Sequence, residues 1–370
     1  MNVKTVPMLS ALLLCAAALP LPAQDTSKVQ GKPIVEVAHF DNYQVTGVAV
    51  SKTGQLYANF PRWSNDYKYA VAEVDKDSNL TPFPDDRWNS WKDKDPAVAD
   101  KWVCVQSITV DDTGALWVLD TGNPGMNGTL PGAPKLVKFD LATKKATQTI
   151  PFGADICPAK SYLNDVRIDT TRQVAYLTES GIGSIIVVDL KSGKTRRLLV
   201  EDKTTLVDKN VDLTINGKEV ETAEKQKPKF NADGIALSPD NAYLYYQAIL
   251  SGKLYRILTS KLLDENLSKD DLSKAVETVG DSFPVDGLWM AKDGNLYLSD
   301  LRTGAIQRRL VPTGKTEMVA ADPRIQWPDS FAQSPDGAIY FSCSHIHHSP
   351  QYNGGKSART EPYTIFKVMP

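Results

Sequence analysis

Six segments of the chain repeat one alternation of apolar and polar positions. Each begins with a polar or small residue, runs into an apolar stretch, passes a turn such as Asp293-Gly294, and returns in an apolar stretch with an aromatic residue. Apolar stretches on both sides of a glycine-containing turn predict a β-hairpin, because glycine accepts the positive φ of tight turns. The six segments are 45–60, 105–120, 163–180, 231–248, 284–300 and 327–343.

A third apolar stretch, and often a fourth, follows each predicted hairpin, as in "SIIVVDL" (184–190) and "TRRLLV" (195–200). Four antiparallel strands repeated every ~40 to 70 residues are typical of β-propeller blades. We therefore predict an all-β fold, a six-bladed β-propeller that forms one domain over residues 33–370. The strand 33–40 precedes the first repeat, and the last repeat ends on its third strand at 363–368. We expect this N-terminal strand to close the last blade and remove an open edge.

Two insertions and one recurring aromatic position complete the pattern. Residues 201–229 contain an Asn216-Gly217 hairpin signal, and 260–275 is the most helix-like stretch. Both insertions fit in the connections between blades. We expect the recurring aromatic residues to pack one blade on the next; they are Tyr57, Trp117, Tyr176, Tyr245, Tyr297 and Tyr340.

The first 23 residues have the pattern of a secretory signal peptide. Lys4 precedes an apolar run from Met8 to Leu19, and small residues follow near position 23. The run is too short for a permanent membrane anchor. We expect a secreted or periplasmic protein after cleavage of residues 1–23, without a membrane anchor.

The charge and the cysteines narrow the range of partners. The net charge is −2 and no basic patch or tail is present, which argues against nucleic acid or an anionic membrane as partner. Export permits a disulfide among Cys104, Cys157 and Cys343. Cys104 and Cys157 each precede a strand of neighbouring repeats, so they are the predicted pair; three buried thiols are the alternative.

Several motifs resemble the major royal jelly protein/yellow family, in particular its bacterial members. They are "ALWVLDTG" (115–122), "AYLTESGIGSIIVVDL" (175–190), "DGIALSPDNAYLYYQAILSGKLYRI" (233–257) and the closing "YTIFKV" (363–368). The resemblance spans about residues 40–369. It implies a secreted six-bladed propeller whose central cavity binds a small molecule, with amines as ligands of some insect members and melanin chemistry as the setting of others. Isomerase-type activity on an aromatic metabolite is the reaction that it suggests.

A second, more distant resemblance is to the senescence-marker/gluconolactonase propellers, which hold a divalent metal at the mouth of the channel. "VDGLWMAKDGNLYLSDL" (285–301) is similar to one of their motifs. This resemblance implies Asp286, Asp233 and Asn164 as ligands of Ca²⁺ or Mg²⁺, whose bound water would attack a lactone. The first blade departs from the pattern, since Thr46-Gly47 stands where those proteins have an acid.

The starts of the predicted inner strands carry polar residues, which should ring one end of the channel. We predict a ligand-binding ring of Gln106, Asn164, Asp165, Asp233, Asp286 and Asp329. Carboxylates that face one another raise one another's pKa or attract a cation. The alternative for any single Asp is that it binds backbone N–H groups of a turn. Acidic residues at second-strand ends, such as Asp120, Glu179 and Asp300, are expected above the ring.

Three of the four histidines lie within "SCSHIHHSP" (342–350). Strand alternation would put Cys343, His345 and His347 on one face. We predict that His345 and His347 contact the ligand at the rim of the pocket. A zinc site or a purely structural role are the alternatives.

These observations support three functions. The first is a secreted propeller that binds a small molecule at its channel mouth and has isomerase-type activity. The alternatives are a divalent-metal-dependent lactone hydrolase and a non-enzymatic scaffold that binds protein. No phosphate-binding loop and no nucleophile elbow occur in the sequence.

Overall fold

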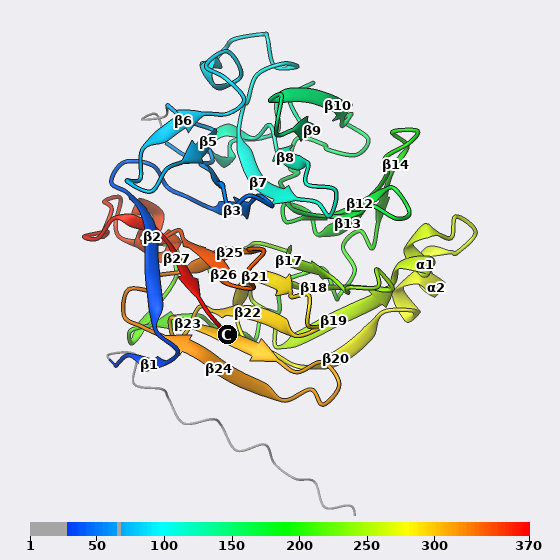
Figure 1. Cartoon of the computed structure of the whole chain (residues 1–370). Helices are drawn as coiled ribbons and strands as arrows, with labels where there is room; N and C mark the ends of the chain where they lie inside the picture. The colour runs from blue at the N-terminus through cyan, green and yellow to red at the C-terminus, as the bar shows by residue number, and fades with distance from the viewer. Residues whose placement is uncertain (1–27, 65–67) are drawn as a thin grey trace, which may run out of the picture.

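Six antiparallel sheets stand in a ring in the computed structural model, which describes residues 28–64 and 68–370 (Figure 1). The innermost strand of each sheet contacts the innermost strands of its two neighbours, so the sheets close around one axis. The predicted six-bladed β-propeller is confirmed. The expected signal peptide lies outside the described residues, and no helix within them is long and apolar enough to cross a membrane.

Each blade runs from an inner strand to an outer strand. The first three blades are β3 (Gly47–Val50), β4 (Leu56–Asn59), β5 (Val71–Val74) and β6 (Leu80–Pro82); β7 (Val105–Val110), β8 (Leu116–Asp120), β9 (Lys135–Asp140) and β10 (Lys145–Pro151); and β11 (Leu163–Asp169), β12 (Val174–Glu179), β13 (Ser184–Asp189) and β14 (Thr195–Leu198). Blades four and five are β17 (Ala232–Leu237), β18 (Tyr243–Ala248), β19 (Lys253–Leu258) and β20 (Glu277–Asp281); and β21 (Val285–Met290), β22 (Leu296–Asp300), β23 (Ala305–Arg309) and β24 (Thr316–Ala321).

The sixth blade joins both ends of the chain. Its strands are β25 (Pro328–Gln333), β26 (Ile339–Cys343), β27 (Tyr363–Val368) and, on the outside, β2 (Ile34–Phe40). β2 pairs with β27 from Ile34–Val368 to Phe40–Tyr363, which confirms the predicted closure. The short strand β1 (Gln30–Gly31) adds a fifth strand to blade five, an addition the sequence pattern did not indicate.

Six apolar clusters fill the spaces between neighbouring blades. Each contains one of the recurring aromatic residues; for example, Trp117 of blade two packs against Leu163 and Ile186 of blade three. Tyr57, Tyr176, Tyr245, Tyr297 and Tyr340 take the same role in the other five clusters. The prediction that these residues pack blade on blade is confirmed.

Both insertions form as expected. Asn216 and Gly217 have φ of 51° and 77° and join β15 (Thr214–Ile215) to β16 (Lys218–Glu219). The helix-like stretch forms α1 (Thr259–Leu263) and α2 (Lys269–Lys274) beside blade four (Figure 1). Within the described ranges, four 3-10 helices lie in loops: η1 (Trp88–Ser90), η2 (Pro124–Met126), η3 (Ile346–His348) and η4 (Pro350–Tyr352).

Candidate functional site

The inner strands of five blades share an irregularity at their first residues. Strands β7, β11, β17, β21 and β25 each shift register against the second strand there, whereas β3 does not. A β-bulge re-aims the side chains it contains. The residues within these bulges include every predicted member of the ring: Gln106, Asn164, Asp165, Asp233, Asp286 and Asp329.

Four of these side chains form one group, which we call the carboxyl cluster: Asp165, Asp233, Asp286 and Asp329. They come from blades three to six, and each residue is between 3% and 8% exposed. Asp233 donates a hydrogen bond to Asp286, which also accepts one from Trp327 Nε1 at 2.6 Å.

Burial and mutual repulsion hold protons on this cluster. Burial raises the pKa of Asp286 to about 7, against the hydrogen bond from Trp327, and the charge of Asp165 adds to the rise. Burial and the charge of Asp286 raise the pKa values of Asp233 and Asp329 well above the usual range. The Asp233–Asp286 pair therefore holds a shared proton near neutral pH.

The amides of the ring belong to a separate chain of hydrogen bonds. Gln106 Nε2 donates to Asn164 Oδ1 at 3.2 Å, and the Tyr162 hydroxyl donates to Gln106 Oε1 at 2.7 Å. Trp63 Nε1 in turn donates to the Tyr162 hydroxyl at 2.8 Å. Tyr162 and Trp63 were not predicted as ring partners, because Tyr162 stands one position before its inner strand and Trp63 lies in a loop.

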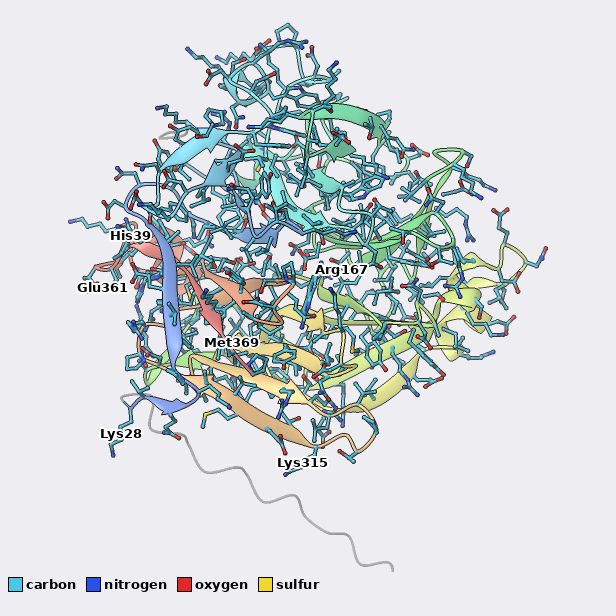
Figure 2. The ribbon with its side chains drawn as sticks, in the orientation of Figure 1. Lys28, His39, Arg167, Lys315, Glu361 and Met369 are labelled. Atoms are coloured by element: carbon cyan, nitrogen blue, oxygen red, sulfur yellow. The ribbon has the colours of Figure 1, made fainter. Side chains whose placement is uncertain are left out.

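One cation, Arg167, lies beside the carboxyl cluster and near the middle of the ring of blades (Figure 2). Its Nη2 lies 3.5 Å from Asp165 Oδ2 and donates to Leu288 O at 2.8 Å. Ser107 Oγ also donates to Asp165, at 2.8 Å. Sequence reasoning missed Arg167, although its place two residues after Asp165 on an inner strand indicates the same face.

An apolar cluster covers the end of the channel that holds these carboxyls. We call it the apolar cover; it consists of Leu213, Ile215, Val220, Ile249, Leu250, Leu301, Trp327, Ile346 and Tyr352. Its members come from the 201–229 insertion and from loops of blades four to six. Trp327 connects the apolar cover to the carboxyl cluster, because its ring lies in the cover and its N–H donates to Asp286.

The histidines lie beyond the end of a strand, which corrects the predicted strand face. β26 ends at Cys343, His345 has a left-handed φ of 51°, and His347 belongs to η3. His347 stacks on Trp327 with 9° between the rings, and His345 packs edge-on against Tyr363. Burial lowers the pKa of both histidines to about 3, so both are neutral at physiological pH. Trp327 connects His347 to Asp286, and no hydrogen bond from the described residues joins either histidine to the carboxyl cluster.

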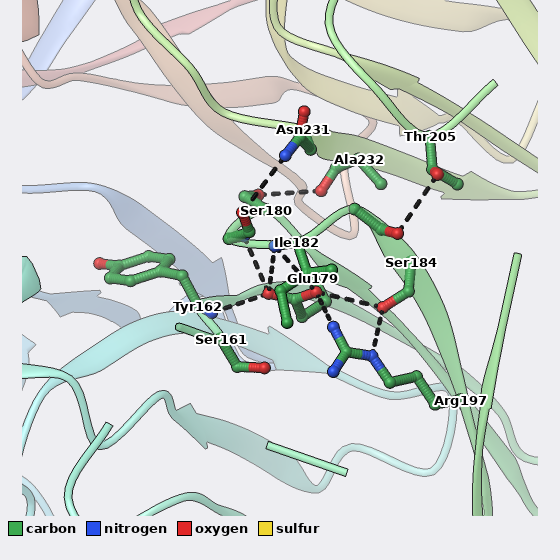
Figure 3. Close-up of polar contacts among 12 residues, drawn as sticks. Ser161, Tyr162, Glu179, Ser180, Ile182, Ser184, Arg197, Thr205, Asn231 and Ala232 are labelled. Carbon is green, nitrogen blue, oxygen red and sulfur yellow. Dashed lines mark hydrogen bonds and ion pairs between the residues drawn. The ribbon is translucent and has the colours of Figure 1, made fainter. Parts of the chain in front are cut away.

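The acidic residues at the ends of the second strands bind the backbone of neighbouring loops. Glu179 accepts hydrogen bonds from Tyr162 N, Gly181 N and Ser184 Oγ, and pairs with Arg197 (Figure 3). Asp120 accepts from backbone N–H groups in blade two and pairs with a lysine. These carboxylates position the loops from which the inner strands begin.

The predicted disulfide is wrong, because Cys104, Cys157 and Cys343 are all buried and free. The two expected partners have different surroundings. Cys104 faces the Tyr162 hydroxyl and Asp120, whereas Cys157 lies in the apolar cluster between blades two and three. Burial raises the pKa of the Cys157 thiol to about 12.

Comparison with known proteins identifies the family. The family model described as "Major royal jelly protein" matches residues 103–342. The chain belongs to the major royal jelly protein family. Major royal jelly protein 5 of Apis mellifera is 25% identical over 237 residues, which cover 61% of this chain and 37% of that protein. Protein yellow of Drosophila melanogaster is 25% identical over 253 residues, 64% of this chain and 43% of that protein. The matches therefore span less than half the length of these relatives.

Solved structures share the propeller fold of this royal jelly family member. A calcium-binding protein, regucalcin, from Agrobacterium tumefaciens has a TM-score of 0.54 at 13% identity, over 92% of this chain and 93% of its own. A gluconolactonase from Xanthomonas campestris has a TM-score of 0.52 at 10% identity, over 91% of this chain and 89% of its own. At these identities the likeness concerns the fold alone.

The divalent metal implied by the gluconolactonase resemblance does not fit the side chains as they stand in this family member. Asn164 Oδ1 accepts from Gln106, and Asp286 accepts from Trp327. Thr46, at the position of the missing acid, donates its hydroxyl to Gln106 O. Across residues 28–64 and 68–370, no three His, Cys, Asp or Glu side chains have a geometry that could hold a metal ion.

Replacement of Asp286 by asparagine is expected to stabilise the protein at alkaline pH. A raised pKa means that the folded state holds a proton that the unfolded state releases above its pKa of about 3.8. Stability from Asp286 is therefore complete below that value and is lost as the pH rises through about 7. The asparagine side chain keeps an acceptor for Trp327 and cannot ionise, so the free energy of unfolding at pH ~8 should rise by about 1–3 kcal/mol.

Urea unfolding at several pH values measures this effect. Asp300→Asn is the matched control, because Asp300 is also buried but accepts from Arg302 N and its guanidinium. That variant should lose stability. An Asp286→Asn variant with the stability and pH slope of the wild type would contradict the assignment.

Proposed function

We propose that this protein binds a small cationic molecule, a primary amine with an aromatic body, at the carboxyl cluster of its channel. The supporting observation is the convergence of four buried carboxyl groups from four blades, beside which the described residues place the guanidinium of Arg167. An ammonium group can replace the shared protons and form charge-assisted hydrogen bonds with the carboxylates. Its binding would lower the repulsion that now raises their pKa values.

The apolar cover suits the aromatic body of such a ligand. Trp327 and Trp63 each donate their indole N–H to the polar network and present their rings to the loops above it. Aromatic walls with a few fixed polar groups are typical of small-molecule sites. Because the cover lies over the carboxyls, binding from this end includes a displacement of the 201–229 insertion.

The Asp233–Asp286 pair supplies the groups for an isomerase-type reaction on the bound aromatic metabolite. One carboxyl gives its proton to one ligand atom while the other, as carboxylate, takes a proton from a second atom. The pair ends with the same number of protons, so the step moves a proton within the ligand and needs no oxidant. A pKa of about 7 at Asp286 suits both roles near neutral pH.

Isothermal titration with tyramine tests the binding proposal. The protein without residues 1–23 should bind tyramine, and 4-hydroxyphenylacetate, which carries the opposite charge on a similar body, should bind at least about tenfold more weakly. Asp233→Asn/Asp286→Asn should lower the tyramine affinity by about tenfold or more. The control is Asp112→Asn, because Asp112 is an exposed carboxylate in the turn after the inner strand β7. This variant should leave the tyramine affinity unchanged.

Absence of tyramine binding, or equal binding by the double variant, would overturn the proposal.

Turnover is measured on the same proteins by the absorbance of an aminochrome, an oxidised aromatic amine. The isomerase step predicts turnover by the wild type that is lost in Asp286→Asn. A calcium titration in the same buffers tests the lactone hydrolase alternative, which requires tight binding of one ion that is lost in the double variant.

A further inference from the structure

The far end of the channel holds a cavity, which the proposed function does not use. It has a volume of about 470 Å³ and is lined by residues from all six blades. The lining comes from the last residues of the inner strands and the turns that follow, such as Val50, Val110, Leu237 and Gln333. Cavities of this size hold small organic molecules. The carboxyl cluster lies at the opposite ends of the same strands.

Arg167 and Trp289 form the inner wall of this cavity. Arg167 is 8% exposed, and its guanidinium carbon lies 5.3 Å from the centre of the Trp289 ring. Its Nη atoms bind Val166 O, Leu288 O and Asp165, but its buried Nε–H has no hydrogen-bond partner among the described residues. The buried Nε1–H of Trp289 is likewise without one. A buried donor without an acceptor costs free energy, which an added acceptor recovers.

The rim of the cavity adds positive charge. Lys52 and Lys292 line it, are exposed, and form no ion pair in the described part of the chain. Of the two acidic residues in the lining, Asp111 accepts hydrogen bonds from its own turn and from Trp117 Nε1. Asp112 is exposed. Together with Arg167, Lys52 and Lys292 give the lining three cationic side chains against two carboxylates. The carboxylate of Asp111 is already bound within its own turn.

We propose that this cavity binds a small organic anion with a flat, apolar body, such as an aromatic carboxylate. The carboxylate would lie against the guanidinium of Arg167, and a shift of that side chain would bring its buried Nε–H, which has no acceptor among the described residues, to the anion. The ring would lie against Trp289 and the apolar side chains of the inner strands. This site differs from the carboxyl cluster in charge, in place and in ligand class.

Ligand-observed NMR and isothermal titration with indole-3-carboxylate test the proposal. The carboxylate should bind, and indole-3-carboxamide, which has the same body without the charge, should bind at least about tenfold more weakly. Lys52→Glu/Lys292→Glu should lower the carboxylate affinity by about tenfold or more. These exposed positions avoid the risk that a change at buried Arg167 prevents folding. Lys203→Glu/Lys261→Glu, an equal change of charge at exposed positions outside the cavity, should have less than a twofold effect.

A second variant separates this cavity from the carboxyl cluster. Asp233→Asn/Asp286→Asn should bind indole-3-carboxylate like the wild type. The proposal is overturned if the carboxylate does not bind, if the carboxamide binds equally, or if the two lysine double variants lose affinity equally.

Discussion

Substitution of Asp120 by alanine is expected to lower the free energy of unfolding by about 4 kcal/mol or more. The Asp120 side chain is 0% exposed and lies 2.9 Å from Lys135 Nζ, whose side chain is 1% exposed. Its removal leaves a buried ammonium with backbone carbonyls as its remaining partners, Val98 O and Ala133 O. It also removes the acceptor for the backbone N–H groups of Val103 and Cys104, which lead into β7.

A double variant separates the effect of the charge from that of the loop contacts. Asp120→Ala/Lys135→Met should be more stable than Asp120→Ala alone, because the uncompensated charge is gone. Asp112→Ala, at an exposed position in the turn between β7 and β8, should change stability by about 0.5 kcal/mol at most. Urea unfolding measures all four proteins. A loss below about 1 kcal/mol for Asp120→Ala would contradict a stabilising role for the buried Asp120–Lys135 pair.

Substitution of Gly287 by alanine is expected to cost about 3 kcal/mol or more, for a reason that lies in the neighbouring blade. A Cβ at this position would lie 1.7 Å from Asp329 O and 2.9 Å from Asp329 C. These are backbone atoms of the next inner strand, so no side-chain rotation relieves the overlap. The bulge of β21 or that of β25 must move, and with it one carboxyl of the cluster.

The control is a glycine of the same blade with free space around it. A Cβ at Gly294 meets no atom within 4 Å, although its φ of 81° makes alanine cost about 1 kcal/mol. Thermal and urea unfolding of the two variants compare the cost of a steric overlap between neighbouring inner strands with the cost of a positive φ alone. Equal losses for Gly287→Ala and Gly294→Ala would contradict the tight packing of inner strands at the bulges.

The sequence predicted the architecture because its signals are local. Each hairpin needs only a period-two pattern and a turn such as Asn216-Gly217, and the repeat of six such units leaves little choice of fold. The closing pair β2–β27 followed from a spare strand at one end and a missing one at the other. The ring residues were found for the same reason, since all stand at the first positions of inner strands.

The remaining features depend on contacts between residues far apart in the chain. The bulges that turn Asp233 and Asp286 toward each other arise from strand pairing, and the repeat pattern does not contain them. The partner of Asp286 is Trp327 of the next blade, 41 positions away. Asp120 and Glu179 are buried acids at the ends of second strands, but their carboxylates accept hydrogen bonds from loop N–H groups.

The central claim is that the carboxyl cluster holds protons at neutral pH, and infrared difference spectroscopy between pH ~6 and pH ~9 tests it most directly. A protonated carboxyl absorbs apart from a carboxylate, and exposed Asp and Glu residues have already ionised at the lower pH. We predict a protonated-carboxyl band that is lost as the pH rises through about 7, and that is reduced in Asp286→Asn but unchanged in Asp300→Asn. A wild-type spectrum without this band at pH ~6, or a band of equal size in Asp286→Asn, would contradict the account.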